Sequence, residues 1–331
     1  MTSTPSHEIE PGATTYGVDL GGTHVRIGRV DHAGAVVEKV KTDTPDTLDG
    51  IVDTIAGAVE QLRTNASGAD GHALDVLGVG AAGMVDRDGV IHYSPNVPAF
   101  IGAPVAARLE AALGMPVTVD NDANVAALAE LVHGAVRGHT DALVITLGTG
   151  VGGGIVTGGR VLRGAHGFGG EVGHFQVDPH GPACACGETG HWEALASGTA
   201  LGALARARAG AGAAPSVLAR AGGSVDAVTG ALTGDAALAG EADAIAIVHE
   251  FAVQVAIGLV GLVNVLDSEV VVVSGGLIDL GDLLLDPIRE AFRGHLEGAR
   301  YRPEVPVMAA RLGDDAGLVG AAVLARELVV R

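Results

Sequence analysis

The segment from residue 171 to residue 197 holds both cysteines of the chain together with three histidines and three glutamates. Four of its side chains are potential metal ligands: His174, Cys184, Cys186 and His191. Two thiolates and two imidazoles are the kind of ligand set that tetrahedral zinc prefers. The segment therefore predicts a zinc site, and the alternative is a glycine-rich surface loop in which the cysteines and histidines occur incidentally and bind no common metal ion.

Two glycine-rich turns have compositions that suit phosphate binding. The first is Asp19-Leu20-Gly21-Gly22-Thr23 and the second is Gly148-Thr149-Gly150, and each lies between two β-prone runs. The backbone N–H groups of such a turn can point at an anion, and the missing side chains allow a close approach. One such turn alone would indicate a hairpin, but the pair favours a nucleotide. Neither turn has the Walker A or the Rossmann pattern, so a different nucleotide-binding architecture is expected.

A carboxylate follows a predicted strand at Asn121-Asp122, where a helix begins. Ligands of α/β proteins bind at the carboxyl ends of strands. An aspartate at this place is also a common helix cap. Because the chain holds two candidate phosphate turns, we interpret Asp122 as the group that takes a proton from an alcohol as it attacks a phosphoryl group.

The composition excludes several classes of partner. Acidic residues number 39 and basic residues 20, for a formal charge of −19, which disfavours nucleic acid and anionic membrane surfaces. The two cysteines are one residue apart, where a disulfide would be strained, so a reducing cytoplasm is expected. The N-terminal residues lack the pattern of a signal peptide. The apolar run 251–266 contains Gln254 and Asn264 and predicts a buried core helix, not a membrane span.

Strands and helices alternate along the chain, which predicts an α/β fold. The strands are expected at 16–20, 25–30, 35–40, 76–79, 117–119, 142–147, 154–156 and 270–273. The helices are expected at 49–63, 123–136, 242–266 and 316–330, with further helices over 200–240 and after residue 277. Asp314 and Asp315 are expected to supply a carboxylate that caps the last helix. The two glycine turns lie 127 residues apart and suggest two related halves facing one cleft.

These motifs together resemble the ROK family of sugar kinases and repressors, named for repressors, open reading frames and kinases, within the actin-like ATPase superfamily. The resemblance covers nearly the whole chain. The matching segments are 19–23 for the first phosphate motif, 121–122 for the catalytic motif, 147–154 for the second phosphate motif, 171–193 for the sugar and zinc segment, and 271–276 (VVVSGG) for the adenosine-side turn with Gly275 and Gly276.

The resemblance implies a glucokinase-type ATP:hexose 6-phosphotransferase in which Asp122 deprotonates the 6-hydroxyl of the sugar. The residues it implies for the other hydroxyls are Asn96, Asn121, Glu171, His174 and Glu193. It implies ATP with Mg²⁺, which Asp19 contacts through water, and a structural Zn²⁺. One ring nitrogen of His174 would bind zinc and the other would donate to the sugar. The chain departs from the family pattern at His191, where the family has a cysteine, and this puts zinc affinity in question.

The fold implied is α/β, with two actin-like ATPase (ribonuclease H-like) lobes around a central cleft. The expected division is a disordered tail over 1–13, a small lobe of 14–126 plus 314–331, and a large lobe of 127–313 with the zinc-binding segment 171–197. The expected partners are a sugar and a nucleotide, and the resemblance suggests a homo-oligomer, dimer or tetramer.

Three alternatives stay open. A repressor of the same family would carry a DNA-binding module, for which the eighteen residues before Asp19 are too few. A kinase for N-acetylmannosamine, fructose or allose would have the same motifs, and polyphosphate could replace ATP as the donor. A protein that binds sugar without catalysis would bind it tightly and turn over no ATP.

Overall fold

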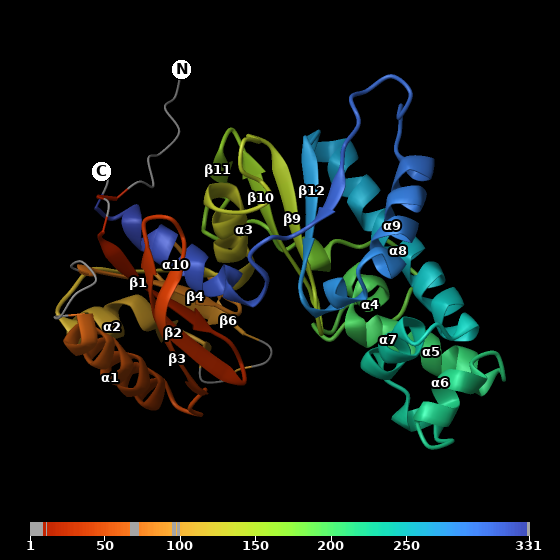
Figure 1. The fold of residues 1–331 in the computed structure, drawn as a ribbon, viewed down its shortest axis with the longest axis horizontal. Helices are drawn as coiled ribbons and strands as arrows, with labels where there is room; N and C mark the ends of the chain where they lie inside the picture. Colours follow the sequence, from red (N-terminus) through yellow and green to blue (C-terminus); the bar gives the residue numbers. More distant parts are fainter. Residues whose placement is uncertain (1–8, 11, 67–72, 95–96, 98–99, 330–331) are drawn as a thin grey trace. The chain divides into compact units, whose positions relative to one another are not determined.

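The computed structural model describes residues 9–10, 12–66, 73–94, 97 and 100–329 of the chain. The chain forms two compact units. The first consists of Met1–Thr140, Gly154–Gly170 and Arg311–Arg331, and the second of Asp141–Gly153 and Glu171–Ala310. Residues 1–8 and 11 of the predicted N-terminal tail lie outside the described residues. Figure 1 shows the course of the chain and the labels used below.

The first unit is built on a five-stranded sheet in the order β3-β2-β1-β4-β8. Its strands are β1 (Thr14–Leu20), β2 (His24–Asp31), β3 (Val36–Asp43), β4 (Ala73–Ala81) and β8 (Val117–Asn121). The first three strands form an antiparallel meander, whereas β4 pairs in parallel with β1 and with β8. The parallel strands place the carboxyl ends of β1, β4 and β8 at the same edge of the sheet.

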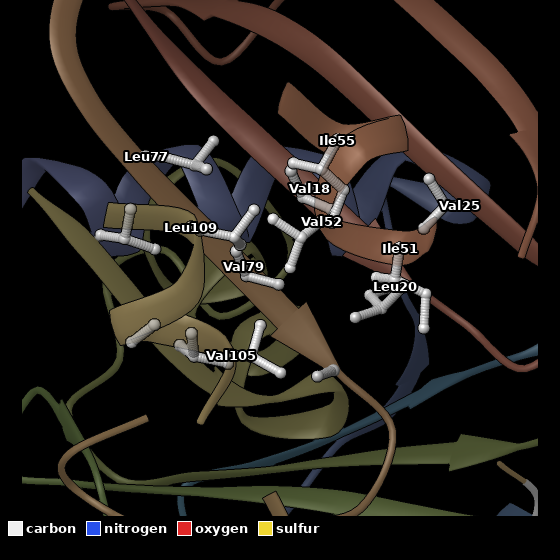
Figure 2. Packing of buried hydrophobic residues seen from close by; sticks show 14 of the residues in the cluster. Val18, Leu20, Val25, Ile51, Val52, Ile55, Leu77, Val79, Val105 and Leu109 are labelled. Carbon is white, nitrogen blue, oxygen red and sulfur yellow. The ribbon is translucent and has the colours of Figure 1, made fainter. Parts of the chain in front are cut away.

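One face of this sheet carries the hydrophobic core of the unit. Alternate residues of β1, namely Tyr16, Val18 and Leu20, are fully buried on that face because successive side chains of a strand point to opposite sides. The helices α1 (Leu48–Ala66) and α2 (Val105–Leu113) contribute the opposing side chains. Figure 2 shows Val52 and Ile55 of α1 beside Val18, Ile51 beside Leu20, and Leu109 of α2 beside Val79.

The opposite face of the sheet is lined by glycines and covered by α10 (Ala316–Arg326). A methyl group added at Gly17 or at Gly78 would overlap the backbone of α10. These positions therefore require glycine, because the helix lies directly on the strands. Arg326 at the end of α10 is fully buried and donates from Nη2 to the carbonyl oxygen of Asp31 and from Nε to Thr15. Burial lowers the pKa of Arg326 to about 10.

The remaining elements of the first unit are a small second sheet and the helix that follows β8. A three-stranded sheet consists of β5 (Met84–Val85), β6 (Val90–Tyr93) and β7 (Ala103–Pro104). The helix α3 (Asp122–Val132) follows β8 directly and packs against α10. Glu130 of α3 is buried, and its carboxylate accepts from the backbone N–H groups of Ala135, Arg311 and Leu312. This carboxylate fixes the chain where it enters α10 through the short 3₁₀ turn η5 (Gly313–Asp315).

A second sheet has the order β11-β10-β9-β12-β13. Its strands are β9 (Ala142–Leu147), β10 (Val151–Thr157), β11 (Arg160–Val161), β12 (Val270–Ser274) and β13 (Val307–Ala309). β12 is parallel to both β9 and β13. All five residues of β12 are buried, as expected for a central parallel strand.

The helices of the second unit surround a long apolar helix, α8 (Ala242–Leu266). The others are α4 (Glu193–Ala196), α5 (Gly198–Gly210), α6 (Pro215–Arg220), α7 (Gly230–Leu238) and α9 (Asp282–His295), with the 3₁₀ turns η2 (Val172–His174), η3 (Val225–Ala227) and η4 (Gly276–Leu280).

α8 is long and apolar enough to span a membrane by length and composition, which is weak evidence because core helices of soluble proteins meet the same criteria. Its fully buried residues include Phe251 and Val255. The indole of Trp192 packs on Gly258 and donates to the carbonyl oxygen of Gln254. The other side of α8 exposes Val253, Ile257 and Val265. One side of α8 therefore belongs to the core of the second unit, as predicted, while the other does not.

The alternation of strands and helices predicted from the sequence is confirmed, and the mixed α/β fold class with it. The helix predicted over 123–136 ends earlier, at Val132, since the Glu130 carboxylate takes up the N–H group of Ala135. The predicted cap of the last helix is wrong. Asp315 makes no side-chain cap bond in η5 or α10, and its carboxylate pairs instead with Lys39 at 2.7 Å. The helix α2, the small β5–β7 sheet and the strands β11 and β13 were not predicted from the sequence.

Candidate active site and metal centre

The first glycine turn joins β1 to β2 in the first unit. The N–H group of Gly21 donates to the carbonyl oxygen of His24 at 3.1 Å and closes the turn. The hydroxyl of Thr44 donates to the carbonyl oxygen of Gly21 at 2.7 Å. Gly22 and Thr23 are exposed at the tip. The turn is thus a well-supported hairpin whose tip is open to a ligand.

Asp19 lies on the α10 face of β1, two residues before the turn. Its Oδ2 accepts from Arg26 at 3.0 Å, and its carboxyl group lies against Gly317 at the start of α10, where an added methyl group would contact it. Burial raises the pKa of Asp19, and the neighbouring Arg26 opposes that rise. The ion pair with Arg26 was not foreseen, although alternation along β1 and β2 pairs residues 19 and 26 directly.

The predicted catalytic motif lies where β8 ends and α3 begins. Asn121 is the N-cap of α3, and its Oδ1 accepts from the N–H groups of Ala123 and Asn124. Its Nδ2 donates to the carbonyl oxygen of Gly83 at 3.0 Å. Asp122 is the first residue of the helix, and its Oδ1 accepts from the N–H group of Ala123 at 2.8 Å. The carboxylate of Asp122 therefore lies where the carboxyl end of β8 meets the N-terminus of α3.

The second glycine turn joins β9 to β10 in the second unit. The N–H group of Gly148 donates to the carbonyl oxygen of Gly150 at 3.0 Å, and the carbonyl oxygen of Gly148 accepts from the N–H group of Gly198 at 2.7 Å. The hydroxyl of Thr199 donates to the carbonyl oxygen of Thr149 at 2.8 Å. The start of α5 therefore holds this turn.

The predicted adenosine-side turn lies beside the second glycine turn. β12 ends at Ser274, which is paired with Thr146 of β9. Gly275 follows with φ +89°, and an added methyl group would overlap the backbone of Leu147. Only glycine fits both the conformation and the space. The structure thus brings Gly275 and Gly276 to the same edge of the sheet as the Gly148–Gly150 turn.

The four predicted metal ligands come together in the second unit. One ligand atom from each of His174, Cys184, Cys186 and His191 lies within 4.8 Å of all the others. Cys184 Sγ lies 3.8 Å from His174 Nδ1, and Cys186 Sγ lies 3.2 Å from His191 Nδ1. Tetrahedral zinc with bonds of about 2.0–2.3 Å separates its ligands by about 3.3–3.8 Å, so small rotations complete the set. Burial raises the pKa of the Cys184 thiol to about 11, and a bound cation would have to displace that proton.

Two glutamates adjoin this cluster. Glu171 Oε2 lies 4.0 Å from His174 Nε2, the ring nitrogen that does not face Cys184. Burial raises the pKa of Glu171, the neighbouring imidazole lowers it and the charge of Glu193 raises it further. Glu193 begins α4, accepts from the N–H group of Val151 at 3.0 Å through Oε2, and accepts from Cys184 Sγ at 3.4 Å through Oε1. Glu193 therefore connects the metal cluster to the second glycine turn.

Asn96 lies outside the described residues. The structure brings together the other predicted site residues in two groups, one in each unit. Asp19 to Thr23 and Asn121-Asp122 belong to the first unit, and the second turn, the metal cluster, both glutamates and the Gly275-Gly276 turn belong to the second.

Residues 15–328 match the model of the ROK family. The chain belongs to the ROK family. The resemblance that the motifs indicated is thereby confirmed over nearly the whole chain.

Individual ROK proteins are similar to this chain over almost their full length. A glucokinase of Streptomyces coelicolor is 43% identical over 316 residues, which is 95% of this chain and 98% of that protein. The crystal structure of a ROK family glucokinase from Streptomyces griseus in complex with glucose and AMPPNP is 42% identical, with a TM-score of 0.82, over 95% of this chain and 99% of the other. An N-acetylmannosamine kinase of Escherichia coli is 30% identical over 95% of this chain and 98% of that protein.

Proposed function

We propose that this protein is an ATP-dependent hexose kinase that phosphorylates the 6-hydroxyl of glucose. The observation that carries the proposal is the capped start of α3, where Asp122 follows Asn121, in a chain 43% identical to a glucokinase over 95% of its length. The identity to N-acetylmannosamine kinases is lower, at 30–33%, which favours glucose over that sugar.

Asp122 is the proton acceptor in the proposed reaction. As the 6-oxygen attacks the γ-phosphorus of ATP, its proton passes to the Asp122 carboxylate. The bond between that oxygen and phosphorus forms, the bond from the γ-phosphorus to the bridging oxygen breaks, and ADP leaves. Proton acceptance of this kind supplies roughly 10²–10⁴-fold of rate, and alignment with charge neutralisation supplies most of the remainder.

The sugar-binding residues of the proposal are Asn121, Glu171, His174 and Glu193, with Asn96 carried over from the family motif. His174 Nε2 lies 4.0 Å from Glu171 Oε2, and this distance supports the two side chains as a pair that hydrogen-bonds neighbouring hydroxyls of the sugar. A site that bonds particular hydroxyls discriminates against epimers that leave its polar groups unsatisfied.

The nucleotide-binding residues of the proposal are the two glycine turns and Gly275-Gly276. Mg²⁺ bound with ATP would neutralise charge on the transferring phosphoryl group. We propose that Asp19 contacts Mg²⁺ through water. Its Oδ2 is already bonded to Arg26 and its side chain is only 21% exposed, so a bridging water suits it better than direct coordination of the metal.

Zinc fits the cluster of His174, Cys184, Cys186 and His191, whose ligand atoms already lie within 4.8 Å of one another. Four protein ligands fill a tetrahedral site and leave no position for substrate, so the role proposed for the metal is structural. When bound, it fixes the ring of His174 in one orientation. We further propose that the protein acts in the cytoplasm as a homo-oligomer, an inference that rests on the reduced thiols and on the family.

The test is a coupled assay for ADP release with the purified protein across glucose, mannose, fructose, allose and N-acetylmannosamine. Glucose should give the highest kcat/KM. A higher value for another sugar would move the proposal to that sugar, and no ADP release with any of them would overturn it. Replacing ATP by polyphosphate in the same assay identifies the donor.

A further inference from the structure

A buried carboxylate lies directly beside the proposed proton acceptor. Asp120 is the residue of β8 before Asn121, and it is 5% exposed. Its Oδ1 accepts from the N–H group of Asn121 at 2.7 Å and from Nδ2 of Asn124 at 3.1 Å. Its Oδ2 accepts from Nε of Arg163 at 2.5 Å. Both oxygens of Asp120 therefore accept hydrogen bonds, one from the segment of Asn121 and Asn124 and the other from Arg163.

Arg163 comes from a loop that begins after β11. The N–H group of Gly169 donates to the carbonyl oxygen of Arg163, which closes the loop over residues 163–169. Arg87 donates to the carbonyl oxygen of Gly164 and ties the same loop to the turn after β5. Two residues after this closure the chain reaches Glu171.

Arg163 is held mainly by Asp120. Its Nη2 is buried without a hydrogen-bond partner among the described residues and lies 3.9 Å from Glu327 Oε1. Burial alone would lower the pKa of Arg163, but the charges of Asp120 and Glu327 raise it. The guanidinium of Arg163 is therefore charged, and its closest counter-charge is the carboxylate of Asp120, the residue before Asn121.

We propose that the Asp120–Arg163 ion pair is a positioning element for the proposed kinase reaction, which fixes the Asn121-Asp122 turn against the loop leading to Glu171. The inference rests on the proposed function for its effect on rate, but not for its effect on the turn itself. Neither residue touches the reacting atoms in this proposal. They act through the backbone of Asn121 and through the side chain of Asn124.

The hydrogen-bond pattern explains why an aspartate is required at this position. An asparagine has one acceptor oxygen, so it would place its amide N–H₂ group against either Arg163 Nε or the N–H group of Asn121, and two donors would face each other. Removing the arginine instead would leave a buried carboxylate without its charged partner, which is strongly destabilising. A lysine at position 163 keeps the charge and one donor.

A cavity of about 890 Å³ adjoins this ion pair. It is lined by Asp120, Arg163, Arg87 and Glu327 among others, and not by Asn121 or Asp122. Its arginines and carboxylates balance, so its charge favours neither an anion nor a cation.

The experiment compares Arg163→Met, Arg163→Lys and Asp120→Asn with the wild type. Arg163→Met and Asp120→Asn should lower kcat roughly tenfold to a hundredfold, because a misplacement of about 1 Å costs on the order of 10²-fold. The KM for glucose should stay within about threefold, since Asn121 keeps its bonds to Gly83, Ala123 and Asn124. Arg163→Lys should recover most of the lost kcat. The matched control is Arg108→Met, which breaks the exposed ion pair with Asp49 in the same unit.

Hydrogen exchange of the amides of residues 121–124, measured without substrate, separates this inference from the proposed function. Exchange should become faster in Arg163→Met and remain unchanged in Arg108→Met. Unchanged exchange together with an unchanged kcat in Arg163→Met would overturn the positioning role. Faster exchange in a protein whose wild type phosphorylates no hexose would contradict only the proposed function. A loss of stability in Arg163→Met and Arg163→Lys alike, with kcat per folded molecule unaffected, would show a purely structural anchor and also overturn it.

Discussion

In the first unit the glycine turn after β1 lies beside a carboxylate that is paired with an arginine, whereas in the second unit the turn after β9 lies beside a carboxylate that bonds to the turn itself. Asp19 accepts from Arg26, and Glu193 accepts from the N–H group of Val151. In both turns a threonine hydroxyl from another element, Thr44 or Thr199, donates to a carbonyl oxygen.

For the two phosphate turns of the proposed function, the difference predicts two kinds of site. The residue of β9 that corresponds to Asp19, 127 residues later, is Thr146, which carries no charge. The first turn therefore has a carboxylate available for a metal–nucleotide complex, while the second can offer backbone N–H groups and depends on Glu193 and α5 for its shape. Glu193 also contacts Cys184, so only the second turn is joined to the metal cluster.

The largest expected effect tests whether both turns serve one phosphoryl transfer. Asp122→Asn should lower kcat by roughly 10²–10⁴-fold, because the amide cannot accept the proton of the 6-hydroxyl. Glucose binding, measured by calorimetry, should be retained. Wild-type turnover in this variant would exclude Asp122 as the proton acceptor.

The next effect separates the two turns by charge. Asp19→Asn should lower kcat by roughly tenfold to a hundredfold and raise the Mg²⁺ concentration needed for half-maximal activity, since the carboxylate no longer offsets Arg26 or holds the metal's water. The matched control is Thr146→Val at the corresponding position of the second turn, where kcat should change by less than about threefold. Equal losses in the two variants would remove the distinction between the turns.

Metal removal should act on the second turn and not on the first. Elemental analysis should find one zinc per chain, and Cys186→Ser should lower that content and reduce Tm by roughly 5 °C or more, because metal binding stabilises the folded state. Hydrogen exchange should then become faster at residues 148–151 and stay unchanged at residues 20–24.

The control for metal removal is His180→Gln, an exposed histidine of the same segment outside the ligand cluster. It should keep a full complement of zinc. Active wild-type protein without zinc would contradict the metal site, and faster exchange at both turns would contradict its selective link to the second.

The smallest effect concerns the carboxylates whose pKa is raised by burial, Asp19 in the first unit and Glu171 in the second. A raised pKa means that the folded state binds the proton more tightly than the unfolded state. The stability from Glu171 is therefore full below the ordinary glutamate pKa of about 4.3 and is lost as pH rises through the folded-state pKa. Thermal unfolding should show the wild type losing Tm relative to Glu171→Gln as the pH rises above the ordinary glutamate pKa of about 4.3. The opposite trend would mean that His174 outweighs burial.

The local patterns were sufficient for most of the fold. The antiparallel meander followed from β-prone runs separated by short turns, and β12 followed from four consecutive valines that a serine and two glycines follow. The patterns failed where a distant side chain decided the end of an element. The Glu130 carboxylate ends α3 early, and Lys39 takes the carboxylate that was expected to cap the last helix.

The sequence by itself determined which residue types are available for chemistry. A proton acceptor needs a carboxylate, a zinc site needs thiols and imidazoles close together in the chain, and a phosphate turn needs glycines. Those features depend on neighbours along the chain, and the metal cluster shows how well close spacing predicts proximity. Only the tertiary structure decided the distant partners of these groups, namely Arg163 for Asp120, Thr44 for Gly21 and Val151 for Glu193. The physical reason is that a buried charge requires a counter-charge or a donor in space, and chain spacing does not specify which of many distant residues supplies it.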